Sequence, residues 1–156
     1  METKTAAQEL ELELALLARS MEAIYRLRGY PLERSHHLLL RTLRKGPRRS
    51  SDLADALLLD RSTIARQVSA LENLGLARRE PDADDGRSYL VATTAKGKEL
   101  CAATSAMRVG RIETLFESWS AEQRRALVES LQHLNRDFSK SLRELASTNL
   151  KAFGYA

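Results

Sequence analysis

Short polar side chains cluster at the start of a helix that we expect over residues 61–74. Ser62 and Thr63 carry hydroxyl groups, which can bond to phosphates or to base edges. Arg66 can bind guanine O6 and N7 with two donors, and Gln67 can pair with adenine. Slim, hydrogen-bonding side chains of this kind suit a helix that enters the major groove of duplex DNA.

The helix that must position these groups is indicated by the apolar residues between them. Ile64, Val68 and Leu71 recur at intervals of four and three, which places them together on one face. The polar groups are then left on the other face. Asp60 is a suitable N-cap for this helix.

A shorter helix precedes this one in the sequence. We expect it through residues 52–57, with Ser50 or Ser51 as its N-cap and residues 58–60 as the turn that follows. Two helices joined so closely, the second with small polar groups on its exposed side, predict a helix-turn-helix.

After residue 75 the hydrophobic period changes from that of helices to that of strands. We expect strands over residues 76–80 and 88–93, joined by a polar loop over residues 81–87. The segment 81–88 then forms a hairpin wing beside the helix-turn-helix. Arg87 at its tip can reach a minor groove, where narrow A·T-rich stretches concentrate negative potential.

Long helices are expected on both sides of this central segment, and their apolar stripes exceed what a small central domain could cover. Packing within one chain is one explanation. A homodimer whose terminal helices interlace about a two-fold axis is the other, and it is the one we favour. The flanking helices are expected over about residues 6–28, 34–45, 95–118 and 120–148.

These elements define the predicted architecture, whose fold class is mainly α. It is a winged helix-turn-helix with a two-stranded β wing, plus N- and C-terminal helices that form a dimerisation lobe. We expect a single domain over residues 1–156, in which residues 34–93 form the DNA-binding lobe. The dimerisation helices are expected within residues 6–30 and 95–150.

The composition fits a globular protein of a reducing compartment. Hydrophobic residues make up 43% of the 156 residues and charged residues 29%, both ordinary values. The net charge is only +4, so DNA binding has to depend on where the charges face rather than on a basic block. The lone cysteine, the acidic N-terminus and the lack of an apolar run near roughly 18 residues predict a cytoplasmic protein with no membrane span.

Sequence patterns for catalysis and metal binding are missing. The chain has no glycine-rich phosphate loop and no nucleophile elbow, so we expect neither an enzyme nor a cofactor. His36 and His37 are adjacent and point to different sides of a helix, which makes them poor ligands for one metal ion. Leu115, Phe116 and Trp119 are expected to pack in the core.

Taken in order, the motifs of residues 50–100 resemble the multiple-antibiotic-resistance regulator (MarR) family. The resemblance implies a dimer with one wing per subunit, acting as a repressor on a pseudo-palindromic operator. It also implies a small anionic, often phenolic effector that weakens DNA binding. The matching residues are Leu53-Ala54, Asp60-Arg61-Ser62-Thr63, Leu71-Glu72, Gly75-Leu76, Arg79, Asp82, Asp85-Gly86-Arg87 and Thr93-Thr94-Ala95-Lys96-Gly97.

The resemblance also extends the set of residues expected to face DNA. Asp85 is expected to hold the Arg87 side chain in place. Gly86 departs from the family, which usually has a bulkier and often basic residue there, so this wing carries one positive charge fewer. The residues expected at the DNA are Ser51, Arg61, Ser62, Thr63, Arg66, Gln67, Ser69, Arg79 and Arg87.

Further residues fall where such regulators have regulatory sites. Tyr25, Tyr30 and His36 lie where the family's effector pocket would be, with core or interface packing as the alternative. Cys101 favours a packing role, because peroxide-sensing relatives use a cysteine near the first helix; a thiol-based redox sensor is the alternative. The sequence also leaves open a helical module whose winged domain binds protein, and a small-molecule-binding protein or enzyme.

Overall fold

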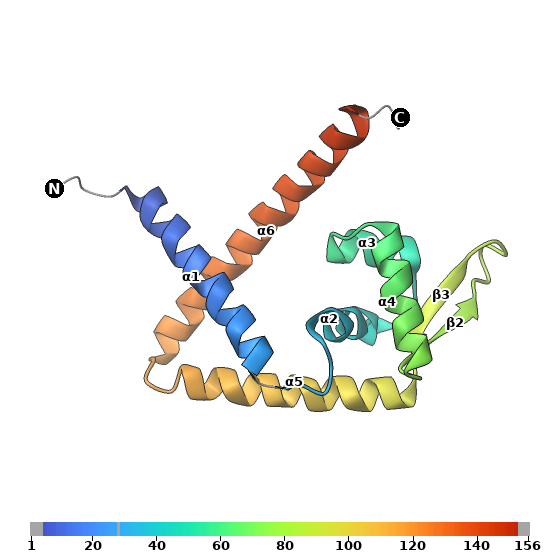
Figure 1. Cartoon of the computed structure of the whole chain (residues 1–156), viewed down its shortest axis with the longest axis horizontal. Coiled ribbons are helices and arrows are strands. Elements are labelled where there is room, and N and C mark those ends of the chain that lie inside the picture. The colour runs from blue at the N-terminus through green and yellow to red at the C-terminus, as the bar shows by residue number, and fades with distance from the viewer. Residues whose placement is uncertain (1–4, 28, 153–156) are drawn as a thin grey trace.

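Three long helices make up about half of the chain, and a lobe of shorter elements lies at one end of the helix that runs along the base of the molecule (Figure 1). The computed structural model describes residues 5–27 and 29–152. The predicted ranges also include residues 1–4, 28 and 153–156, which lie outside the described residues. The long helices are α1 (Ala6–Leu27), α5 (Ala95–Leu115) and α6 (Ala121–Ala152).

The lobe contains the predicted helix-turn-helix and hairpin, which confirms the mainly α fold class with a β wing. The 3-10 helix η1 continues α2 directly, so the two together fill the helix expected over residues 34–45. The elements of the lobe are α2 (Arg34–Thr42), η1 (Leu43–Lys45), β1 (Arg48–Arg49), α3 (Ser50–Leu57), α4 (Arg61–Asn73), β2 (Ala77–Pro81) and β3 (Tyr89–Thr93).

The sheet has three strands in the order β1-β3-β2, whereas two were predicted. Both neighbouring pairs are antiparallel: Arg49 of β1 lies opposite Leu90 of β3, and Pro81 of β2 lies opposite Tyr89. The strand β1 was missed because its two residues are both arginines, too few and too polar to show the alternation that marks a strand. Its pairing with β3 holds the start of α3 beside the wing hairpin.

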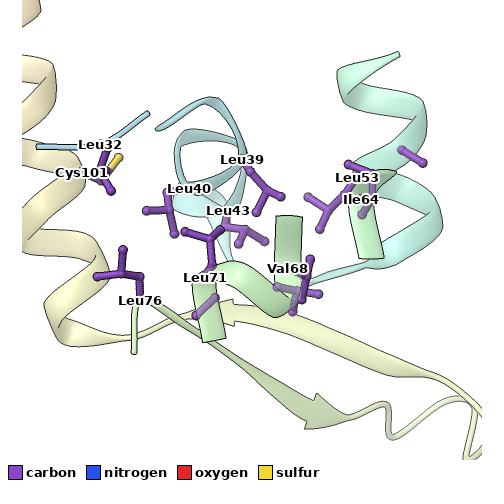
Figure 2. Close-up of a cluster of buried hydrophobic side chains, with 13 residues drawn as sticks. Leu32, Leu39, Leu40, Leu43, Leu53, Ile64, Val68, Leu71, Leu76 and Cys101 are labelled. Atoms are coloured by element: carbon purple, nitrogen blue, oxygen red, sulfur yellow. The ribbon is translucent and has the colours of Figure 1, made fainter. Parts of the chain in front are cut away.

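The apolar face of α4 fills the centre of the lobe, as its spacing predicts. Ile64, Val68 and Leu71 have no side-chain surface accessible to solvent. Figure 2 shows the leucines of α2 and η1 pointing toward Val68 and Leu71, and Leu53 of α3 beside Ile64. Burial of such side chains stabilises the fold by about 1.5–3 kcal/mol each. The core therefore fixes which side of α4 faces outward.

The long helix α5 is joined to the end of α4 by polar contacts. Thr94 caps α5 by accepting the Gly97 backbone N–H at 3.0 Å, and its hydroxyl donates to the Gly75 carbonyl oxygen at 2.7 Å. The Lys96 Nζ donates to the Leu74 carbonyl oxygen at 2.9 Å, where the α4 dipole favours a cation. A Cβ at Gly97 would collide with the backbone oxygen of Leu76, so only glycine allows this close approach.

Three local predictions were wrong. The residue before α3 is Arg49, without a side-chain cap, because the chain enters the helix directly from β1; neither Ser50 nor Ser51 caps it. The helix α5 ends at Leu115, where the backbone of Phe116 leaves helical geometry, and not at residue 118. The corner between α5 and α6 is uncovered, so Leu115 and Trp119 are 62% and 40% exposed instead of lying in the core.

The turn of the helix-turn-helix contains a backbone conformation that L-residues avoid. Leu58 has φ 55° and ψ 43°, the left-handed region, and within residues 5–27 and 29–152 no other non-glycine residue has a positive φ. Its side chain is 36% exposed. The neighbouring Leu59 is similarly exposed, at 38%.

Replacing Leu58 by glycine is therefore expected to destabilise the protein less than the same replacement of Leu59. Relief of a left-handed leucine, at about 1–2 kcal/mol, offsets the added chain entropy of glycine, at about 0.5–1 kcal/mol. Urea denaturation followed by circular dichroism, at one fixed protein concentration, measures the difference. Leu59→Gly is the matched control, since it adds the same entropy without relieving strain, and it should destabilise more. Equal destabilisation by both substitutions would contradict the account.

Candidate nucleic-acid interface

The helix α4 lies beside the wing hairpin (Figure 1), and its polar side faces away from the core. Arg61, Ser62 and Arg66 are exposed, whereas Thr63 and Gln67 are half-buried at the edge of the helix. This arrangement follows directly from burial of the opposite face. The first half of α4 thus presents hydroxyl and guanidinium groups to solvent, whereas the amide oxygen of Gln67 is buried without a partner among the described residues.

A network around Asp60 orders the start of α4. One carboxylate oxygen accepts the Thr63 backbone N–H at 2.7 Å and the Ser62 hydroxyl at 2.6 Å; the other accepts the Thr63 hydroxyl at 2.7 Å. These bonds hold the pKa of the Asp60 carboxyl well below its usual range, with the Ser62 bond as the largest cause. The Thr63 hydroxyl in turn accepts Nη2 of Arg66 at 3.2 Å. The arginine is therefore oriented along the helix in the free protein.

Two of the residues predicted at the DNA are engaged with the protein itself. Nη1 of Arg79 lies 2.5 Å from the Glu72 carboxylate, and Nη2 donates to the Ser69 hydroxyl at 3.2 Å. The same guanidinium stacks over the ring of Tyr89, 4.8 Å from its centroid. Arg79 and Ser69 thus tie the wing strands to the second half of α4.

The wing loop is shaped by Asp85 in a different way from that predicted. Its carboxylate accepts the backbone N–H of Arg87 at 3.0 Å, and its carbonyl accepts that of Ser88 at 2.9 Å. In the described residues it makes no bond to the Arg87 guanidinium, which is exposed at the tip. Asp85 therefore holds the backbone of the loop and leaves the Arg87 side chain free.

Ser51 lies half-buried at the start of α3, where its hydroxyl is 3.5 Å from a carboxylate oxygen of Asp52. It lies on the other helix of the helix-turn-helix from Arg66. The remaining predicted DNA-facing residues gather on α4 and at the wing. The structure thus separates an unbonded or locally bonded set on α4 and the wing tip from Ser69 and Arg79, which bond to each other; Arg79, though exposed, is also paired with Glu72.

A second polar cluster lies where α1, α2 and α5 meet. The rings of Tyr25 and Tyr30 are 5.5 Å apart. The Arg108 guanidinium lies over both, at 4.8 and 4.7 Å, and donates to the Tyr25 hydroxyl. Arg111 lies 4.2 Å from the Tyr30 centroid. Arg34 of α2 lies 5.3 Å from the Tyr25 centroid, so three cations share this site with two phenols.

Several buried donors of this cluster have no partner among the described residues. They are Nε and Nη2 of Arg108 and Nη1 of Arg111; the acceptor Nδ1 of His37 is likewise buried without a partner. Burial, followed by the charges of Arg108 and Arg41, lowers the pKa of His37 to about 4, so its ring is neutral at pH 7. Buried guanidinium groups normally find acceptors, so this site is chemically suited to an anion.

The sequence led to the two tyrosines of this cluster but not to its cations. His36, which was expected there, makes no hydrogen bond or ring contact with the cluster in the described part of the chain. Its neighbour His37 is buried instead and bonded to Ser105 at 2.9 Å. A usable signal was present: Arg108 and Arg111 are three residues apart and are the only charged residues between residues 101 and 112.

Other functional chemistry finds little support in the described part of the chain. Cys101 is 4% exposed, and burial raises the pKa of its thiol, which disfavours the thiolate that a redox sensor needs. Within residues 5–27 and 29–152, no three His, Cys, Asp or Glu side chains are grouped as a metal site requires. None of the described helices is both long and apolar enough to span a membrane.

Comparisons with known proteins agree with this geometry. A family model described as MarR family matches residues 30–88. The uncharacterised HTH-type transcriptional regulator YxaD of Bacillus subtilis strain 168 is 37% identical over 143 residues, which cover 88% of this chain and 99% of the relative. The transcriptional regulator HosA of Escherichia coli O157:H7 is 32% identical over 82 residues, 53% of this chain and 61% of that protein.

Solved structures share the fold at low sequence identity. A MarR protein from Peptoclostridium difficile has a TM-score of 0.75 at 18% identity, covering 93% of this chain and 97% of that one. The PcaV transcriptional regulator of Streptomyces coelicolor, solved in complex with its natural ligand, has a TM-score of 0.72 at 18% identity, covering 87% and 98%. With a relative matched over almost its whole length, the chain belongs to the MarR family of DNA-binding transcriptional regulators.

Proposed function

We propose that the protein is a homodimeric repressor that binds a pseudo-palindromic operator in the cytoplasm. Each subunit places α4 in a major groove and the wing, residues 81–88, in the adjacent minor groove. The observation that carries this proposal is the fixed outward face of α4, with Arg66 oriented by Thr63 and Arg87 free at the wing tip. Half-site centres are expected about 10 bp apart.

The proposed dimer rests on apolar surface that one chain leaves uncovered. The helix α1 has no buried residue in the isolated chain, although it is rich in leucine. In Figure 1, α1 extends away from the lobe, and α6 begins at the end of α5 that is farther from the lobe. A second copy would cover these faces through residues 6–30 and 95–150, leaving residues 34–93 for DNA. The side chains concerned are Leu10, Leu16, Leu17, Val109, Ile112, Leu115, Val128, Phe138, Leu142 and Leu145, each 48% or more exposed.

Functions of other classes have less support. A winged domain that binds protein would not need an arginine aligned along the outer face of α4. The named relatives are transcriptional regulators, which are not enzymes. The buried Cys101 offers no thiolate for a redox sensor. DNA binding would use the exposed groups of α4 in the major groove and those of the wing in the minor groove, so one function explains both sets of groups.

We further propose that an aromatic carboxylate binds at Tyr25, Tyr30, Arg108 and Arg111 and releases the DNA. The unpartnered guanidinium donors suit a carboxylate, and the neighbouring phenol rings suit an aromatic body. The site joins α1 and α5 of the proposed dimerisation region to α2 of the lobe. A ligand there can change the preferred angle between the dimerisation region and the DNA-binding lobe. PcaV, with its natural ligand bound, shows that one protein of this fold holds a ligand.

Replacement of Arg66 by alanine should weaken operator binding by about 1–3 kcal/mol and relax specificity at one base position. The operator is selected from a random duplex library, and affinities for its single-base variants are measured by fluorescence anisotropy. Arg125→Ala, which removes the same charge from the distant helix α6, is the control. A uniform loss on every variant would instead make Arg66 a phosphate contact.

Replacement of Arg87 by alanine should weaken binding most on duplexes with A·T-rich flanks. The narrow minor groove there concentrates the negative potential that an inserted arginine senses. Affinity is compared on two duplexes that share the operator core and differ in flanks, one A·T-rich and one G·C-rich. An equal loss on both duplexes, or none on either, would remove the minor-groove role.

The effector site predicts a preference for carboxylates over their esters. Hydroxybenzoates should bind by titration calorimetry and displace labelled operator DNA, whereas their methyl esters should bind at least about tenfold more weakly. Arg108→Met should abolish this preference, while Arg125→Met should retain it. Thermal melting checks that both variants are folded. Equal affinity of acid and ester for the wild-type protein would rule out recognition of the carboxylate.

A further inference from the structure

A buried carboxylate lies at the point where the wing loop leaves the sheet. Asp82 directly follows β2, and only 3% of its side chain is accessible to solvent. One of its carboxylate oxygens accepts the backbone N–H of Asp84 at 3.0 Å. The other lies 2.6 Å from Nε of Arg49, which is its one ion-pair partner in the described residues.

The partner of this carboxylate comes from a different part of the lobe. Arg49 ends β1 and directly precedes α3, so it belongs to the frame of the helix-turn-helix. Its backbone is paired with Leu90 of β3. Its side chain therefore bonds to a wing residue that lies 33 positions later in the sequence. The Arg49 hydrogen bond is the largest cause that lowers the pKa of Asp82, so the pair is ionised at neutral pH.

This pair makes the conformation of the wing loop depend on Arg49. A carboxylate with so little access to water needs its counter-charge, and without one it turns toward solvent or takes up a proton. Either change disturbs the bond by which Asp82 holds the Asp84 amide. Arg87 follows three residues later in the same loop. Removal of the Arg49 side chain would thus change the position of Arg87 by changing the conformation of the loop backbone.

We propose that Arg49 is a positioning residue, which sets the wing against the helix-turn-helix and thereby places Arg87 at the minor groove. The inference rests on the wing contact proposed above. It is distinct from a direct role at the DNA, even though the Arg49 side chain is 41% exposed. A phosphate contact by Arg49 would lower affinity equally on all sequences, whereas a positioning role acts only where Arg87 acts.

The neighbouring Arg48 provides a matched control. It lies in the same two-residue strand, carries the same charge and makes no ion pair or side-chain hydrogen bond in the described part of the chain. Arg49→Met and Arg48→Met therefore remove equal charge from adjacent positions. Asp82→Asn serves as a second variant, since it keeps the shape of the side chain but cannot form the ion pair.

The first test follows the wing without DNA. Hydrogen–deuterium exchange of the free, full-length protein is measured on peptides covering residues 82–88. Arg49→Met should speed exchange in this loop, because the Asp82 carboxylate without its counter-charge turns toward solvent and no longer accepts the Asp84 N–H, whereas Arg48→Met should not. In Asp82→Asn, whose amide oxygen still accepts that N–H and needs no counter-charge, adding Arg49→Met should have little further effect. If exchange in the loop is unchanged in Arg49→Met, Arg49 does not anchor the wing and the inference is overturned.

The second test compares affinities for the selected operator with A·T-rich and G·C-rich flanks. The wild-type preference for A·T-rich flanks should fall about tenfold in Arg49→Met, as for one lost groove contact. It should fall little further when Arg87→Ala is added. Arg48→Met should keep the preference. An intact preference in Arg49→Met would overturn this inference alone. A wild-type protein with no preference would overturn the proposed wing contact, and this inference with it.

Discussion

Burial of the apolar face of α4 is the constraint on which the rest of the lobe depends. Ile64, Val68 and Leu71 are fully enclosed by leucines of α2, η1 and α3. Turning the helix by even a fraction of a turn would expose them, at about 25 cal/mol for each Å² of apolar surface. The outward direction of Arg66 and the position of the wing beside it are consequences of this packing.

The same lobe is tied to its neighbours by polar contacts that reach far along the chain. Lys96 and Thr94 bind the end of α4 to α5, and Arg79 binds its second half to the wing. On the other side, Arg108 joins α5 to the end of α1. A regulator that responds to a ligand needs such connections, because an effector acts only through a difference in its contacts between two arrangements.

The sequence was sufficient for elements defined by period and by local capping. The face of α4, the Asp60 cap and the hairpin all follow from spacings of four residues or fewer, or from one polar loop. Contacts between distant residues could not be predicted in this way. The Arg49–Asp82 pair joins residues 33 positions apart, and the Arg108–Tyr25 contact joins residues 83 apart. A strand of two arginines and a left-handed leucine likewise carry no periodic signal.

The central claim is that two copies of α4 read two major grooves on one face of the duplex. Methylation interference at guanine N7, combined with hydroxyl-radical footprinting on the selected operator, tests this most directly, because N7 lies in the major groove and radical cleavage reports minor-groove access. The account predicts two interfering guanine clusters about one helical turn apart, each flanked on its outer side by minor-groove protection. Interference at a single cluster, or protection without any guanine interference, would contradict it.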